Sequence, residues 1–247
     1  MRVAVLADIH GNILALEAVL TDLAHRRPDL IVDLGDRASG PLWPRETLDR
    51  LASIDALTVR GNHDRWLAAQ DPTEMGPSDR FAFHETSAAQ RVALGALPVT
   101  RTVAPGILAF HATPTDDNSY LLDVVEGGRV ARDRPDRIAA RLGQIDARLV
   151  LCGHSHRPDI VKLPGGPLIL NPGSIGCPAY EDGAYVSESG SPHARYAIVE
   201  TRADKDFAIE LFTIPYNNEA AARRAEKNGR AEWAHGLRTG FMPPLAS

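Results

Sequence analysis

Five short segments of the chain carry side chains of the types that bind divalent metal ions. Five of the nine histidines fall in these segments, together with carboxylates and one asparagine. Carboxylate and imidazole ligands together suit Mn, Fe, Zn or Ni. The segments are DIH with Asp8 and His10, GD with Asp36, GNHD with Asn62, His63 and Asp64, the single His111, and GHSH with His154 and His156. Metal-assisted hydrolysis is the chemistry that this set predicts first.

Each segment also has a simpler structural explanation. Asp8 with Asn12 could cap a helix, GD could be a strand-to-loop turn, and GNHD could be a turn followed by a cap at Asp64. A lone His111 is more often a core or surface residue than a ligand. GHSH differs, because alternating histidines in an extended segment place two imidazoles on one face. Taken together, always after an apolar run, the five segments favour a metal site.

The elements that must position these segments are short apolar strands separated by helices. A helix is expected after residue 12, because Ile13, Leu16, Val19 and Leu23 recur at helical spacing. Binding sites in α/β sheets lie beyond the carboxyl ends of strands, where all five segments fall. We predict strands at 2–7, 30–34, 56–59, 107–110 and 148–152, with weaker helices at 45–53 and 135–145. This alternation predicts an α/β layered fold.

The rest of the chain is expected to frame this site within a single domain covering 1–247. Residues 65–105 hold a Pro/Asp/Gly-rich stretch and a helix at 86–94, which we interpret as an insertion that forms a wall or lid. The segment 217–247 is predicted to be a C-terminal helix, at 218–227, and a poorly ordered tail ending in MPPLAS. Strands without intervening helices are predicted at 158–163, 167–170, 195–200 and 206–214.

The ordered motifs DxH, GD, GNHD, H and GHxH resemble the signature of the calcineurin-like metallophosphoesterase superfamily, and in particular its small bacterial phosphodiesterase-type members. The resemblance covers residues 1 to about 200. It implies a four-layer αββα sandwich, in which helices flank two mixed β-sheets and a binuclear metal centre lies at the sheet edge.

Carried over residue by residue, the resemblance implies a role for each motif position. The two metals would share a bridging hydroxide that attacks phosphorus in line. His63 would stabilise the transition state and protonate the leaving group. The implied ligands are Asp8, His10 and His156 for one metal, Asn62, His111 and His154 for the other, and Asp36 as the bridge.

The chain departs from the family pattern at one position. Many members carry a second Asp three residues after the bridging one, where it holds the acid histidine. Here that position is Ser39. The departure leaves the metal ligands intact but puts the orientation of His63 in question. Our hypothesis from sequence is that Asp64 or Ser39 takes over this role, so Asp64 joins His63 as a predicted catalytic residue.

Contacts to the substrate are less well defined by the sequence. Arg37 and Arg60 adjoin ligand segments and are candidates for phosphate contacts, with an ion pair to a nearby carboxylate as the alternative. His84, near Arg80 and Phe83, lies in the insertion, and His193 could face the site or solvent. The loop NPGSIG at 171–176 resembles one that follows GHxH in small family members, although a tight turn explains its Gly and Pro residues.

Charge and composition limit the partners. With a net charge of −5 and 6% aromatic residues, the chain shows no basic patch or stacking surface for long nucleic acid or an anionic membrane. We therefore expect a small phosphate-ester substrate, with a phosphodiester preferred. A phosphomonoesterase with the same mechanism and a non-catalytic scaffold of the same fold are the alternatives. No targeting or membrane segment is recognised, which predicts a cytoplasmic protein, and a homo-oligomer is left open.

Overall fold

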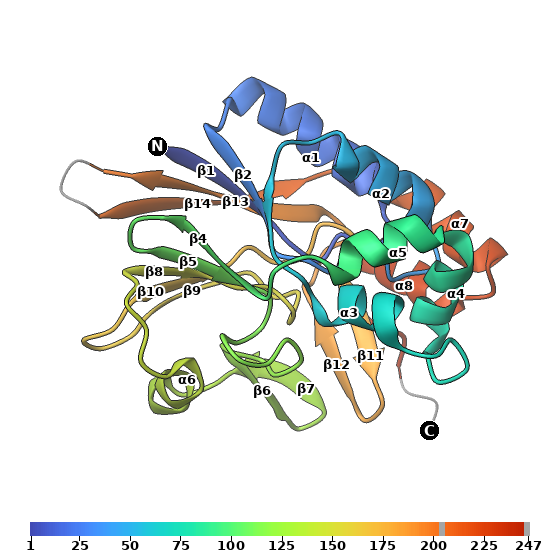
Figure 1. Cartoon of the computed structure of the whole chain (residues 1–247). Helices are drawn as coiled ribbons and strands as arrows, with labels where there is room; N and C mark the ends of the chain where they lie inside the picture. The colour runs from blue at the N-terminus through green and yellow to red at the C-terminus, as the bar shows by residue number, and fades with distance from the viewer. Residues whose placement is uncertain (203–205, 245–247) are drawn as a thin grey trace.

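Two five-stranded sheets lie face to face in the computed structural model, which describes residues 1–202 and 206–244 (Figure 1). The first sheet has the order β14-β13-β1-β2-β3, and the second has the order β4-β5-β8-β10-β9. The first contains β1 (Arg2–Leu6), β2 (Leu30–Asp33), β3 (Leu57–Thr58), β13 (Ala194–Thr201) and β14 (Phe207–Ile214). The second contains β4 (Thr100–Ala104), β5 (Ile107–Phe110), β8 (Leu149–Leu151), β9 (Asp159–Lys162) and β10 (Leu168–Asn171).

Both sheets are mixed, as the family resemblance implied. Strands β1, β2 and β3 run parallel, while β13 and β14 are antiparallel to their neighbours. In the second sheet β5, β8 and β10 run parallel, and β4 and β9 pair antiparallel at the edges. Parallel strands that are covered on both faces read as continuous apolar runs, which is why the sequence predicted them well.

Three apolar layers hold this sandwich together. Side chains such as Val5, Val32 and Leu151 are buried between the two sheets. Helix α1 (Ile13–Arg26) covers the outer face of the first sheet through Leu16 and its neighbours, and Asn12 caps it by accepting from the Ala15 N–H at 3.2 Å. Helix α6 (Pro135–Leu142) covers the outer face of the second sheet. The helix–sheet–sheet–helix order confirms the predicted four-layer architecture.

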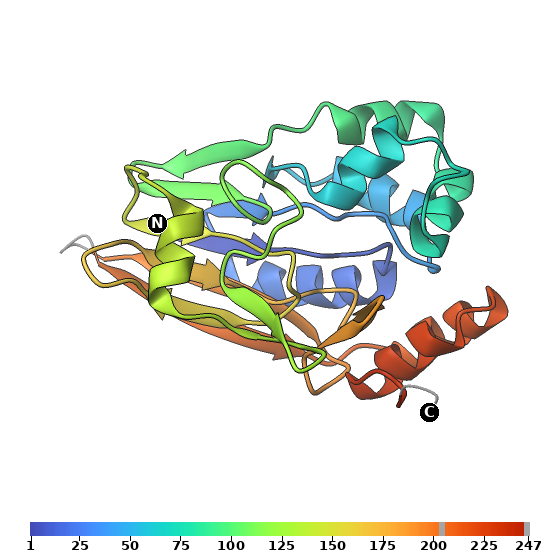
Figure 2. The same ribbon diagram turned by 90° about the horizontal axis from the view of Figure 1, so that it is seen from below.

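Helices gather at the end of the sandwich toward which β1 and β2 point. Figures 1 and 2 both place α3–α5 and α7–α8 at this end. The helices are α2 (Pro44–Ala52), α3 (Asn62–Ala69), α4 (Pro77–Glu85), α5 (Ala88–Gly95), α7 (Asn218–Lys227) and α8 (Ala231–Thr239). The predicted insertion therefore consists mainly of α3, α4 and α5, and its last residues form the edge strand β4 of the second sheet.

A third, four-stranded sheet was not predicted. Its order is β11-β12-β7-β6, and its strands are short and partly exposed, so they lack the apolar runs that identify buried strands. They are β6 (Asp123–Glu126), β7 (Arg129–Arg132), β11 (Ala179–Asp182) and β12 (Tyr185–Glu188). The predicted disorder of the C-terminal tail is wrong for Met242, which is buried against Ala179 and Val186, while 245–247 lie outside the described residues. The described residues include no helix that is long and apolar enough to span a bilayer.

A partly buried hydrogen bond joins α1 to the first sheet and gives a prediction about stability. Asp22 accepts hydrogen bonds from Arg26 at 2.6 Å and from the hydroxyl of the buried Tyr196. Burial opposes ionisation of Asp22, but these two donors outweigh it and hold its pKa below the ordinary 3.8. A depressed folded pKa adds stability above the ordinary value, and this stability is lost as pH falls through the folded pKa.

We therefore expect Asp22→Asn to lower the free energy of unfolding of the metal-free protein by about 1 kcal/mol at pH 7. Urea unfolding at pH 7 and at pH 3 measures this difference between wild type and variant. The difference should shrink at pH 3, because this pH lies below the ordinary pKa of 3.8, so the unfolded wild-type chain takes up a proton there and part of the stabilisation by the carboxylate is lost. An equal difference at both pH values would show that the charge of Asp22 contributes nothing.

Candidate metal centre

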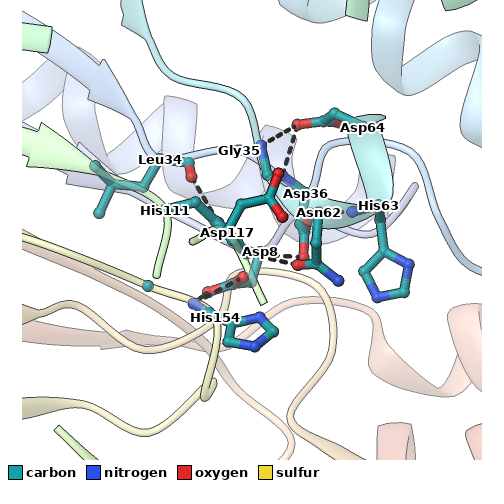
Figure 3. Close-up of polar contacts among 12 residues, drawn as sticks. Asp8, Leu34, Gly35, Asp36, Asn62, His63, Asp64, His111, Asp117 and His154 are labelled. Carbon is teal, nitrogen blue, oxygen red and sulfur yellow. Dashed lines mark hydrogen bonds and ion pairs between the residues drawn. The ribbon is translucent and has the colours of Figure 1, made fainter. Parts of the chain in front are cut away.

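The predicted ligand segments meet at one end of the two sheets and form two compact groups. Within each group the ligand atoms lie within 4.8 Å of one another, and all but one of the side chains are buried. One group is Asp8, His10 and His156, and the other is Asp36, His111 and His154. Figure 3 shows Asp8, Asp36, Asn62, His111 and His154 converging from different loops. The first group consists of the three residues that the resemblance implied for one metal, and the second joins the implied bridge, Asp36, to His111 and His154.

The loops that carry these side chains have an unusual backbone conformation. Five of the six residues in the two groups have φ between 50° and 70°, in the left-handed region that non-glycine residues seldom occupy; these are Asp8, His10, Asp36, His154 and His156. Hydrogen bonds between the loops hold them there, such as His10 N to Asp36 O at 3.0 Å and Gly176 N to Asp8 O at 3.0 Å. Strained backbone of this kind clusters at functional sites.

The first group presents unprotonated nitrogen atoms to one point. His10 Nδ1 donates to the Ser39 carbonyl at 2.7 Å, and His156 Nδ1 donates to the Cys177 carbonyl at 2.8 Å. In a neutral imidazole the other ring nitrogen is then an acceptor. The two Nε2 atoms nevertheless lie only 3.0 Å apart. Two lone pairs at this distance repel each other unless a cation lies against both, so the pair fits a metal ion.

The second group has the same design. His111 Nδ1 donates to the Leu34 carbonyl at 2.8 Å (Figure 3). His154 Nε2 donates to the Asn118 carbonyl at 3.0 Å. The remaining nitrogen of His111 lies 3.1 Å from the Asp36 carboxylate and 3.0 Å from the Asn62 amide. Backbone acceptors of this kind fix the tautomer and ring orientation of metal-binding histidines. The donor set of carboxylate, imidazole and amide fits divalent metals.

Burial and neighbouring charges shift the pKa values of the candidate ligands away from their ordinary values. Burial raises the pKa of the Asp8 carboxyl to about 8 and lowers the pKa of His10 to about 4. Burial also disfavours a charge on His111, but the negative charge of Asp36 outweighs it and raises the pKa of His111 to about 10. Imidazole and carboxylate groups bind a metal in their deprotonated forms, so metal binding at this site is coupled to the release of protons.

Asp64 acts on the backbone around the site. Its carboxylate accepts from the N–H groups of Asp36 at 2.9 Å, Gly61 at 3.0 Å and Arg37 at 3.1 Å (Figure 3). It therefore joins the GD loop to the start of α3. Gly61 is required at this junction, because a Cβ there would lie 2.1 Å from Asp36 Oδ1.

The residue that holds His63 differs from the sequence hypothesis. His63 Nδ1 lies 2.7 Å from the carboxylate of Asp79, which is 4% exposed and belongs to α4 of the insertion. Asp64 is engaged as described above, and the buried Ser39 hydroxyl has no hydrogen-bond partner within the described ranges. Burial disfavours a charged His63, but the charges of Asp79 and Asp36 outweigh it and raise its pKa to about 9.

Sequence reasoning missed Asp79 because it lies in a different segment from every ligand motif. A carboxylate in PSDRF has no spacing relation to GNHD that would single it out. Its position follows from the packing of α4 against α3 through Leu67, Met75 and Ala82.

A cavity of about 560 Å³ opens over both metal groups. Its walls come from α3, α4, α8, the β11–β12 hairpin and the loop after β5, and residues of the 65–105 segment are among them. Outside the metal groups its lining includes Ser39, His63, Asp79, Trp66, Tyr120, Tyr180, Tyr185, Glu181, Asp182, Arg230, Glu232 and Trp233. The aromatic residues are spread along the sequence, which is why no motif indicated them.

The four predicted substrate contacts lie outside this cavity. Arg37 Nε pairs with the Asp33 carboxylate at 2.7 Å, which is the alternative considered from sequence. Arg60 Nη1 reaches the Gly95 carbonyl at 3.4 Å, and His193 Nδ1 lies 3.2 Å from the Ser191 hydroxyl. His84 lines a separate pocket of about 390 Å³, together with Arg80.

The NPGSIG loop packs against the DIH segment. Ile175 N donates to the Ala7 carbonyl at 3.0 Å, and Cys177 N donates to Ser174 Oγ at 2.8 Å. A Cβ on Gly176 would lie 1.7 Å from the Ile9 carbonyl oxygen. The glycine and the N–H groups therefore have structural roles, in line with the turn explanation.

Comparison with known proteins gives the family. The model of the calcineurin-like phosphoesterase superfamily domain matches residues 1–204. An uncharacterized protein of Methanocaldococcus jannaschii is 26% identical over 257 residues, which cover 94% of each chain. A metallophosphoesterase from Sphaerobacter thermophilus has a similar structure, with a TM-score of 0.72, 23% identity, and coverage of 96% of this chain and 98% of that one.

A hypothetical protein from Pyrococcus horikoshii OT3 has a TM-score of 0.76 at 19% identity, with coverage of 98% of this chain and 99% of that one. These likenesses extend over the whole fold, and the family model includes every ligand segment from Asp8 to His156. The resemblance inferred from the motifs is thereby confirmed. The chain belongs to the calcineurin-like phosphoesterase superfamily and is a metal-dependent phosphoesterase.

Proposed function

We propose that the protein hydrolyses a small phosphate ester, preferably a phosphodiester, by in-line displacement at phosphorus with His63 as proton donor. The observation that carries this proposal is the pairing of two groups of inward-facing metal ligands with a histidine that belongs to neither group. A site built only to bind metal would need no such histidine, held through one ring nitrogen and lining the cavity.

The ligand residues would hold two divalent ions, drawn from Mn, Fe, Zn or Ni. When bound, these ions supply an activated water nucleophile and positive charge for the phosphoryl oxygens. In the proposed arrangement Asp8, His10 and His156 hold one ion, Asn62, His111 and His154 hold the other, and Asp36 lies between them. Asp64 fixes the position of Asp36 relative to the start of α3 through its three hydrogen bonds to backbone N–H groups.

His63 donates a proton to the leaving alcohol. The water oxygen forms a new bond to phosphorus while the bond between phosphorus and the alcohol oxygen breaks, and the electron pair stays on that oxygen. Because Asp79 holds Nδ1, His63 Nε2 is free to give its proton to the departing alkoxide. The attacking water releases one proton to solvent, and His63 takes up one proton from solvent, so the enzyme returns to its starting state.

The cavity supports a diester over a monoester. Its volume of about 560 Å³ leaves room for an organic group beyond the phosphoryl position. Its wall also carries the carboxylates of Glu181, Asp182 and Glu232, which oppose the second negative charge of a monoester. A diester has one charge at the phosphate and an organic group on each side.

A metal-replacement assay tests this function. Metal-stripped protein receives each divalent ion in turn and is assayed with bis(4-nitrophenyl) phosphate and 4-nitrophenyl phosphate, beside His63→Ala. We expect metal-dependent turnover, faster on the diester, and a loss of at least tenfold in the variant, within the range known for general acids. The variant should still bind its metals, measured by elemental analysis.

Two results would count against the proposal. Equal rates for His63→Ala and wild type would remove His63 from the reaction. Absence of turnover with every metal, in protein that holds two ions per chain, would favour the scaffold alternative.

A further inference from the structure

We propose that the cavity selects a phosphodiester in which one alcohol carries an ammonium group, quaternary or fully alkylated like that of a choline ester. This inference rests on the proposed function, because it assumes that the phosphate sits on the metal groups. The ammonium group belongs to the alcohol that is esterified to this phosphate.

Four aromatic side chains that line the cavity each contact one histidine of the site. Ring centroids are 4.7 Å apart for Trp66 and His63, 5.0 Å for Tyr120 and His154, 4.6 Å for Tyr180 and His156, and 6.2 Å for Trp233 and His10. The four aromatic residues come from α3, the loop after β5, β11 and α8, and all line the cavity. A group that projects from the phosphate therefore meets aromatic side chains on several sides, and such surroundings suit cations.

The charges of the lining point to the same class of ligand. Asp79 pairs with His63, and the single arginine, Arg230, pairs with Glu232. Glu181 and Asp182 have no cationic partner among the contacts of the described residues. A second phosphate in the cavity would face these two carboxylates and be repelled, whereas an ammonium group would be attracted.

The tyrosine hydroxyls are already engaged with one another. Tyr120 and Tyr180 share a hydrogen bond at 2.5 Å, Tyr120 and Tyr185 share one at 3.1 Å, and Tyr185 donates to Asp182 at 2.8 Å. Their rings, rather than their hydroxyls, remain for a ligand. This favours a cation over a sugar or base that needs several hydrogen-bond partners.

A separate observation, at Ser39, concerns the place of the phosphate in the cavity. The Ser39 side chain is 1% exposed and lines the cavity, yet its hydroxyl has no partner within the described part of the chain. Buried hydroxyls are normally hydrogen-bonded, and a phosphoryl oxygen would satisfy this one. The inner end thus suits the phosphate and the outer wall suits the cation.

Two esters of the same shape test the charge preference. They are 4-nitrophenyl phosphocholine and 4-nitrophenyl 3,3-dimethylbutyl phosphate, in which a carbon atom replaces the charged nitrogen. With the metal-loaded protein we expect kcat/KM to be about tenfold higher for the charged ester. A ratio near one, with both esters hydrolysed, overturns the inference and leaves the phosphoesterase function standing.

A pair of double variants with the same change in net charge locates the effect. The double variant Glu181→Gln with Asp182→Asn should bring the ratio of the two esters toward one. The double variant Glu74→Gln with Glu126→Gln removes two exposed charges that do not line the cavity, and it should keep the wild-type ratio. If both variants change the ratio equally, the preference is a long-range effect of net charge and the inference fails.

Calorimetry keeps the test independent of turnover. Phosphocholine and 3,3-dimethylbutyl phosphate are titrated into the metal-loaded wild-type protein. Tighter binding of phosphocholine, by about tenfold, supports the inference even if no ester is hydrolysed. Equal binding of the two contradicts it, whatever the result for the proposed function.

Discussion

Asp36→Asn is expected to abolish metal binding and to lower turnover by at least about 10³-fold, because several kcal/mol of charge stabilisation would be lost and each 1.36 kcal/mol is a factor of ten. One oxygen of the Asp36 carboxylate lies 3.1 Å from His111 Nε2, and the other accepts a hydrogen bond from the backbone N–H of His63 at 3.0 Å. An amide can keep one hydrogen bond but cannot supply the negative charge between the two groups. Elemental analysis after dialysis measures the metal, and a phosphodiester assay measures the rate.

Asp33→Asn is the control for this experiment. Asp33 is also buried in the same segment, but its carboxylate accepts from Arg37 at 2.7 Å and from the Gly35 N–H at 3.0 Å, away from the metal groups. This variant is expected to keep its metals even if its stability falls. If Asp36→Asn retains two ions per chain, or if Asp33→Asn loses them equally, the proposed bridging position is wrong.

The convergence of the candidate ligands could be predicted from sequence, because it depends on the order of the motifs and on their positions at strand ends. Each ligand follows an apolar run, and the parallel strands β1, β2, β5 and β8 bring those runs to one edge. The two compact groups of the structure contain six of the seven residues predicted as ligands, and the seventh, Asn62, lies 3.0 Å from His111. Local pattern and topology therefore lead to the same set.

Other features of the site depend on packing between segments that are far apart in the sequence. The left-handed backbone of Asp8 and Asp36 is stabilised by hydrogen bonds between loops, so no local propensity predicts it. The aromatic wall combines Trp66 of α3 with Trp233 of α8, two helices that are far apart in the sequence. The third sheet consists of four-residue strands that are partly exposed, so no apolar run marks them in the sequence.

Asp79 is the clearest case, and it gives the second large effect. In Asp79→Asn the His63 ring loses the charged acceptor 2.7 Å from Nδ1, which sets its orientation and favours the protonated ring. We expect kcat/KM to fall about 10²-fold for methyl phenyl phosphate and less than about fivefold for methyl 4-nitrophenyl phosphate. The phenolate is the more basic leaving group and needs the proton more, so steady-state rates on the two esters measure the loss of proton donation directly.

The contrast between leaving groups separates positioning of His63 from a general disturbance of the insertion. A variant that merely distorts α4 would slow both esters by the same factor. Arg80→Ala, at the next position of α4 and outside the main cavity, controls for such distortion and should leave the ratio of the two esters unchanged. An equal loss on both esters in Asp79→Asn would mean that Asp79 supports the wall and not the acid. A selective loss would mean that this chain obtains from its inserted helix the carboxylate that related sequences carry three residues after the bridging Asp.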